Sequence, residues 1–169
     1  MWICLLMDEE SRKKMIELCE EENKDLKLSD RFLVFPLHIS LKRSFYTDRF
    51  EEIRRDLDEL MKDVKPVDLG KTELMKMKDM IWVRFEKEEE LLDLHQKIDA
   101  FLSERYGIAI DTFDQHYVGH ASLFRSDEKE KLDQIYERLK KKWPDREVKA
   151  DRWFTGSRQV KNEYRSMIE

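Results

Sequence analysis

The chain has 169 residues, a length that suits one ordinary domain with a core of its own. Hydrophobic residues make up 40% of it and charged residues 42%, with few glycines and prolines, which argues against a disordered chain. The formal charge is -5, from 33 basic and 38 acidic residues. This balance argues against a protein that coats duplex DNA by charge alone, because phosphate neutralisation requires clustered lysine and arginine.

Apolar runs and amphipathic periodicities alternate along the chain. Helical spacing of apolar residues predicts four helices, near 9–24, 48–63, 88–106 and 127–142. Apolar or alternating stretches predict strands at 2–7, 32–41, 67–76, 79–85 and 116–124, with two more in 146–165. Short turns between the third and fourth strands, and between the last two, indicate antiparallel hairpins. The mixed order of elements therefore predicts an α+β protein with antiparallel sheets.

Nothing in the sequence indicates a second domain, a membrane span or a disulfide framework. No linker rich in proline, glycine or serine interrupts the chain, so residues 1–169 are expected to form one domain. Cys4 and Cys19 lack CxxC spacing, and no apolar run approaches the length that spans a bilayer. We expect a cytoplasmic protein without membrane contact.

One seven-residue pattern occurs twice. Residues 38–44 read His-Ile-Ser-Leu-Lys-Arg-Ser, and residues 120–126 read His-Ala-Ser-Leu-Phe-Arg-Ser. The shared pattern is His-x-Ser-Leu-x-Arg-Ser, and it contains two of the four histidines. A single His-x-Ser is usually structural, but its duplication in equivalent strand contexts favours a catalytic pair.

Strand alternation separates a chemical face from a core face in each copy. His38, Ser40 and Lys42 are expected on one face of their strand, opposite the apolar residues. The second copy places His120, Ser122 and Phe124 alike. Two imidazoles on one site form a natural general acid and general base, because an unperturbed histidine titrates near neutral pH. The serine hydroxyls can donate to nonbridging phosphate oxygens, so no metal is required.

These paired motifs, one in each half of a small α+β chain, resemble the two-histidine (2H) phosphoesterase superfamily. Within it, the chain is similar to the RNA 2',3'-cyclic phosphodiesterases, also called 2'-5' RNA ligases. The resemblance implies two pseudo-symmetric lobes, roughly 1–85 and 86–169, each an antiparallel sheet with outer helices, and an active-site cleft between them. It implies RNA ends or nucleotides with a cyclic phosphate or 2'-5' linkage as substrates, no cofactor and no metal. We expect a monomer.

The resemblance also implies roles for the motif residues. It makes His38 and His120 the catalytic pair, with His120 as base and His38 as acid, roles that exchange when the reaction runs in reverse. Both hydroxyl positions carry serine where threonine is common in the family, which keeps the donor and loses the methyl group.

Further candidates for substrate contacts come from the surroundings of the motifs. The candidate phosphate ligands are Ser40, Ser122, Lys42, Arg125 and Arg43. Regular alternation puts both arginines on the face opposite the histidines unless the strand ends or bulges there. Phe124 and Tyr46 are the leading candidates for stacking on a nucleobase.

Two alternatives remain open at this point. One keeps the chemistry and changes the substrate to a cyclic nucleotide or oligonucleotide signal. The other is a catalytically weak module that binds RNA ends or nucleotides. The net acidity makes extended RNA binding less attractive.

Overall fold

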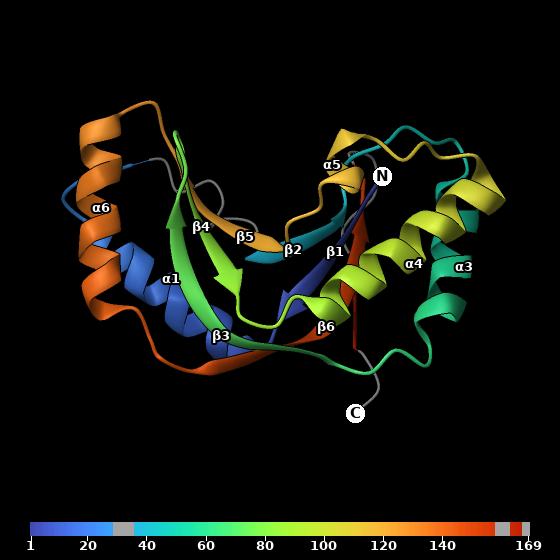
Figure 1. Ribbon diagram of the computed structural model, residues 1–169, viewed down its shortest axis with the longest axis horizontal. Coiled ribbons are helices and arrows are strands. Elements are labelled where there is room, and N and C mark those ends of the chain that lie inside the picture. Colours follow the sequence, from blue (N-terminus) through green and yellow to red (C-terminus); the bar gives the residue numbers. More distant parts are fainter. Residues whose placement is uncertain (29–35, 158–162, 167–169) are drawn as a thin grey trace.

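The computed structural model describes residues 1–28, 36–157 and 163–166 (Figure 1). Its helices are α1 (Glu9–Asn23), α3 (Phe50–Met61), α4 (Glu89–Tyr106), α5 (Thr112–Gln115) and α6 (Lys129–Lys142). Its strands are β1 (Trp2–Met7), β2 (His38–Lys42), β3 (Val67–Lys76), β4 (Met80–Phe85), β5 (His120–Arg125), β6 (Glu147–Gly156) and β7 (Glu163–Ser166). No helix within these ranges is both long and apolar enough to cross a membrane.

Every strand pairing among the described residues is antiparallel, which confirms the α+β class. The seven strands follow the order β1-β2-β5-β4-β3-β6-β7, and β1 also pairs with β6. Six strands thus form a closed ring of pairings. The ring has one narrow junction, because β2 and β5 share a single residue pair, Ile39 with Ala121.

Helices lie at both ends of this sheet. Figure 1 shows α1 and α6 at one end, and α3 and α4 at the other. Helix α6 packs against α1, β3 and β4, whereas α4 packs against β2 and β3. The main core includes Ile39 and Leu41 of β2, Ala121 and Leu123 of β5, and residues of all four longer helices. The sheet faces that carry Ile39 and Ala121 are therefore covered by the core.

The expected lobe division at residue 85 stays a prediction, and the strand pairing qualifies it. β6 lies in the second half of the chain, yet it pairs with β1 from Trp2↔Gly156 to Met7↔Ala150. The two halves of the sequence are therefore interleaved in the sheet. Of the expected strand 32–41, residues 32–35 lie outside the described residues.

The expected strand at 116–124 begins later than its pattern indicates. Asp111 starts the short helix α5 by accepting from the backbone N–H groups of Phe113 and Asp114, and the Asp114 carboxylate accepts from the N–H of Asp111 in return. This capping box holds residues 112–115 in a helical turn, and β5 starts at His120 after a short connection.

Candidate active site

The single pair between β2 and β5 relates the two sequence motifs. Ile39 and Ala121 face each other at this junction, and both are fully buried. Side chains of directly opposed residues share a face, and their neighbours in sequence take the other face. His38, Ser40, His120 and Ser122 therefore project from the same side, which we call the histidine face. A local two-fold axis through the Ile39–Ala121 pair exchanges the two motifs.

Both imidazoles are held in the same way. The Nδ1 of His38 lies 2.9 Å from the carbonyl oxygen of Pro36, and the Nδ1 of His120 lies 2.8 Å from that of Val118. A carbonyl only accepts, so each ring donates its Nδ1–H to the residue two positions earlier. The Nε2 atom of each neutral ring is then left as the basic nitrogen.

The two histidines differ in their aromatic neighbours. The His120 ring stacks on Trp82 of β4, with centroids 3.8 Å apart and planes 20° apart. The His38 ring meets Phe154 of β6 edge to face at 6.0 Å. Burial lowers the pKa of both imidazoles from 6.5, against the opposing effect of the carbonyl hydrogen bonds. His38 and Arg84 lower the pKa of His120 further by charge repulsion.

A β-bulge occurs at the same place in both motifs. In the pairing of β2 with β1, two consecutive residues of β1 face Ser40 and Lys42, so Leu41 has no partner in β1. In the pairing of β5 with β4, two consecutive residues of β4 face Ser122 and Phe124, so Leu123 has no partner in β4. A bulge reverses the alternation beyond it. The repeat is therefore structural as well as sequential.

The bulges correct two of the expected substrate contacts. Lys42 and Phe124 were predicted to share the histidine face, but they are 3% and 0% exposed. Phe124 belongs to the main core, and the Lys42 ammonium binds the carboxylates of Asp99 and Asp114. Neither side chain lies where it could contact a phosphate or a base on the histidine face.

The same reversal brings Arg125 to the histidine side of β5. It pairs with Met80, which shares a strand face with Trp82. Its guanidinium is half-exposed and donates to Asp79 at 3.1 Å. Arg125 thus follows Ser122 along the histidine face, and it stays a predicted phosphate ligand.

Arg43 and Tyr46 lie after the end of β2. The Arg43 guanidinium is 5.1 Å from the centre of the Phe113 ring and 3.9 Å from Asp111. Tyr46 is 92% exposed. Their proposed roles in phosphate binding and base stacking stay predictions.

Cys4 lies directly opposite Ser40 in the β1–β2 register and is hydrogen-bonded to it. Burial raises the pKa of the Cys4 thiol to about 12, although the bond to Ser40 counteracts this. A thiol with this pKa stays protonated at neutral pH and is a poor nucleophile. The cysteine therefore adds no chemistry of its own to the histidine face.

Two residues of β4 were missed by the motif search. Trp82 lies opposite Ser122, and Arg84 lies opposite His120, bound to Glu88 at 2.7 Å. Both occupy the outward positions of an alternating strand whose inward positions are buried. That alternation indicated two outward side chains, but not that β4 pairs with the strand of the second motif.

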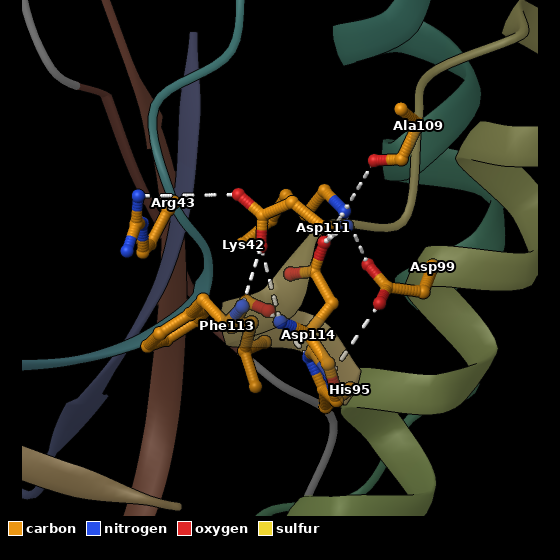
Figure 2. A network of polar contacts seen from close by, with 9 residues as sticks. Lys42, Arg43, His95, Asp99, Ala109, Asp111, Phe113 and Asp114 are labelled. Carbon is orange, nitrogen blue, oxygen red and sulfur yellow. Dashed lines mark hydrogen bonds and ion pairs between the residues drawn. The ribbon is translucent and has the colours of Figure 1, made fainter. Parts of the chain in front are cut away.

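A buried polar cluster behind β2 contains metal-ligand residue types. His95, Asp99 and Asp114 place one donor atom each within 4.8 Å of one another (Figure 2). Helix α4 packs against β2 and leaves His95 1% exposed. The Lys42 ammonium already lies between the two carboxylates. A protein cation thus takes the place that a metal ion would fill.

Comparison with known proteins gives two matches and one negative result. The model of a family described as the 2'-5' RNA ligase superfamily matches residues 12–162, which include both motifs. Eight solved chains match, among them the protein TT0787 of Thermus thermophilus. That crystal structure aligns with a TM-score of 0.56 at 16% sequence identity, over 98% of this chain and 93% of that chain, a likeness that shows the fold alone. A search of curated proteins found no match.

Proposed function

The chain belongs to the 2'-5' RNA ligase superfamily of 2H phosphoesterases, and from this premise we propose that it hydrolyses 2',3'-cyclic phosphates or 2'-5' linkages at RNA ends or on small nucleotides. Superfamily membership supports a phosphoesterase- or ligase-type activity on RNA or nucleotides. The proposed reaction uses His38 and His120 as its acid and base and requires no metal.

The observation that carries this proposal is the local two-fold axis between the motifs. It presents two imidazoles, each fixed through Nδ1, and two serine hydroxyls on one face. In an in-line displacement at phosphorus, the entering and leaving oxygens lie on opposite sides. Two histidines placed diagonally across a two-fold axis suit this geometry, because one can serve each oxygen.

Hydrolysis then follows in one balanced step. The neutral Nε2 of the base takes a proton from water as the water oxygen bonds to phosphorus. The bond from phosphorus to the leaving oxygen breaks, and the other histidine, which starts the reaction protonated, gives that oxygen its proton. Ser40 and Ser122 donate hydrogen bonds to the nonbridging oxygens, with Arg125 available to compensate their charge.

The aromatic neighbours support His120 as the base for hydrolysis. A general base becomes an imidazolium in the transition state, and a cation over the face of an indole is stabilised. The Trp82 ring is stacked on the His120 ring, whereas the rings of Phe154 and His38 are nearly perpendicular to each other. Stacking on Trp82 thus supports His120 as the proton acceptor, against the opposing charge of Arg84.

The test is turnover of 2',3'-cyclic mononucleotides and of RNA ends in the presence of EDTA. We expect hydrolysis by the wild type and a loss of roughly 100-fold or more in His38→Ala and in His120→Ala. His116→Ala is the matched control, because His116 is exposed and precedes β5. Full activity in either motif variant would contradict the proposed mechanism. A panel that adds cyclic nucleotide and oligonucleotide signals separates the substrates that this chemistry allows.

A further inference from the structure

Four ionisable side chains lie together in the core, directly behind the histidine face. Lys42 comes from the bulge of β2, His95 and Asp99 from α4, and Asp114 from α5. All four are buried, with between 1% and 7% of their surface exposed. The Lys42 Nζ lies 2.9 Å from an oxygen of Asp99 and also binds Asp114 (Figure 2).

The hydrogen bonds of His95 define its protonation. Its Nδ1 lies 2.7 Å from the carbonyl oxygen of Leu41, and its Nε2 lies 3.1 Å from that of Asp114. Neither carbonyl can donate, so the two contacts are both hydrogen bonds only when both ring nitrogens carry hydrogen, as in an imidazolium. The Asp99 carboxylate is 3.4 Å from Nε2, and the Tyr117 ring stacks at 3.9 Å, two contacts that favour the cation.

With His95 charged, the quartet holds two cations and two anions. Unpaired charges are costly in a core, whereas a balanced and hydrogen-bonded set is tolerated. The nearby pair of Arg43 and Asp111 is also balanced, and it is more exposed. The cluster is therefore neutral without any ion from solution.

A metal ion fits this cluster less well. A histidine ligand must present a lone pair, but both nitrogens of His95 face carbonyl oxygens. The features that favour a metal are Asp99 Oδ1 and Asp114 Oδ1, which have no hydrogen-bond partner in the part of the chain that the structure describes, although Asp99 Oδ1 is ion-paired with Lys42. The Lys42 ammonium opposes metal binding, because it already binds both carboxylates.

The quartet connects the segments that carry both catalytic motifs. Leu41 and Lys42 directly follow Ser40 of the first motif. Asp114 and Tyr117 lead to Val118, whose carbonyl oxygen holds the His120 ring. We propose that Lys42, His95, Asp99 and Asp114 form a charge-balanced positioning network, with His95 as a buried imidazolium, that keeps the two histidine motifs aligned. Its effect on turnover rests on the proposed function; its charge state does not.

The charge state is tested by NMR on the full-length protein labelled with ¹⁵N-histidine at neutral pH. We expect hydrogen on both nitrogens of His95, slowly exchanging, and on Nδ1 alone in His38 and His120. In Asp99→Asn, which removes one anion, His95 should lose one hydrogen. A wild-type His95 with a bare nitrogen would overturn the proposal, and metal found in the same sample by elemental analysis would assign that nitrogen to a ligand role.

The positioning role is tested by kinetics at a temperature where every variant is folded by circular dichroism. Lys42→Met should lower kcat by roughly 10- to 100-fold with little change in KM, because small misplacements of catalytic groups have effects of this size. Lys42→Met combined with Asp99→Asn restores charge balance and should recover about tenfold of that loss. Asp99→Asn alone, also measured, serves as the reference for the double variant.

A matched core variant separates positioning from general stability. Leu57→Ala removes a fully buried side chain of α3, which contains none of the quartet, so it should lower stability and leave kcat within about twofold. Wild-type kcat in Lys42→Met, or no recovery in the double variant, would overturn the positioning role. Absent hydrolysis by the wild type would instead refute the proposed function, and the NMR result would still stand.

Discussion

His38 and His120 occupy equivalent places in the repeat but different environments. Each donates Nδ1–H to the carbonyl two residues earlier, so their orientation is set by the same local bond. Trp82 then covers one face of His120, whereas His38 lies beside the apolar cluster of Cys4, Leu6 and Phe154. A symmetric backbone thus carries an asymmetric pair of imidazoles, which is what an acid and a base require.

The pH dependence of turnover follows from the direction of the two pKa shifts. Burial lowers both histidine pKa values below 6.5, so the free enzyme holds one proton on the pair only in acidic solution. We therefore expect kcat/KM to peak below about pH 6.5 and to fall roughly tenfold per unit on the alkaline side. A bound phosphodiester favours the imidazolium, so the alkaline limb of kcat should lie at higher pH.

Both profiles are measured with a 2',3'-cyclic mononucleotide between about pH 4.5 and 8.5. The histidine pKa values of the free protein, followed by NMR, provide the control for the kcat/KM limbs. An alkaline limb of kcat/KM well above pH 7 would show that burial does not control the pKa of the catalytic acid.

At the scale of elements, most of the fold follows from local patterns. The strands at 67–76 and 2–7 agree with the structure at both ends, because alternation and apolar runs are local signals. Lys42 and Phe124 were misplaced because a bulge depends on the partner strands β1 and β4, which the motif itself does not specify. Trp82 was missed for the same reason.

Gly119, which directly precedes β5, lies against Leu91 of α4. A Cβ at this position would lie 2.2 Å from Cδ2 of Leu91 and 3.2 Å from its Cγ. Leu91 is fully buried, so its side chain has little room to move. We expect Gly119→Ala to lower the free energy of unfolding by about 1–3 kcal/mol, as overpacking does. It should also lower kcat, because His120 is the next residue.

The double variant Gly119→Ala, Leu91→Ala tests this explanation. Removing the Leu91 side chain makes room for the new methyl group, so kcat should recover even though a core contact is lost. Leu91→Ala alone is the control for the cavity. Urea denaturation measures the free energy of unfolding, and single-substrate kinetics measures kcat. Gly119→Ala with wild-type stability and turnover would show that the strand tolerates the contact.

Across the whole molecule, the ring of strand pairings brings distant segments to one site. Helix α4, β2 and the segment before β5 meet in the buried quartet, although they are separated in sequence. Such contacts leave no local pattern: Lys42 was expected on the histidine face, and no role was predicted for His95. Duplication of the motif identified the histidines, but the residues that support them required the three-dimensional structure.

The net charge of -5 predicts which substrates the whole molecule favours. An acidic protein gains little from a long phosphate backbone, because its 38 acidic residues outnumber its 33 basic ones and repel the added phosphates. We expect kcat/KM for a 2',3'-cyclic mononucleotide to lie within about tenfold of that for a longer RNA with the same end. Raising salt from about 50 to 200 mM should change either value less than about tenfold, whereas six to ten phosphate contacts would cost roughly 10³- to 10⁵-fold. Arg125→Gln provides the control, because the loss of a single phosphate contact should lower kcat/KM equally for both substrates. A large preference for the longer RNA that disappears with salt would instead reveal an extended RNA-binding surface.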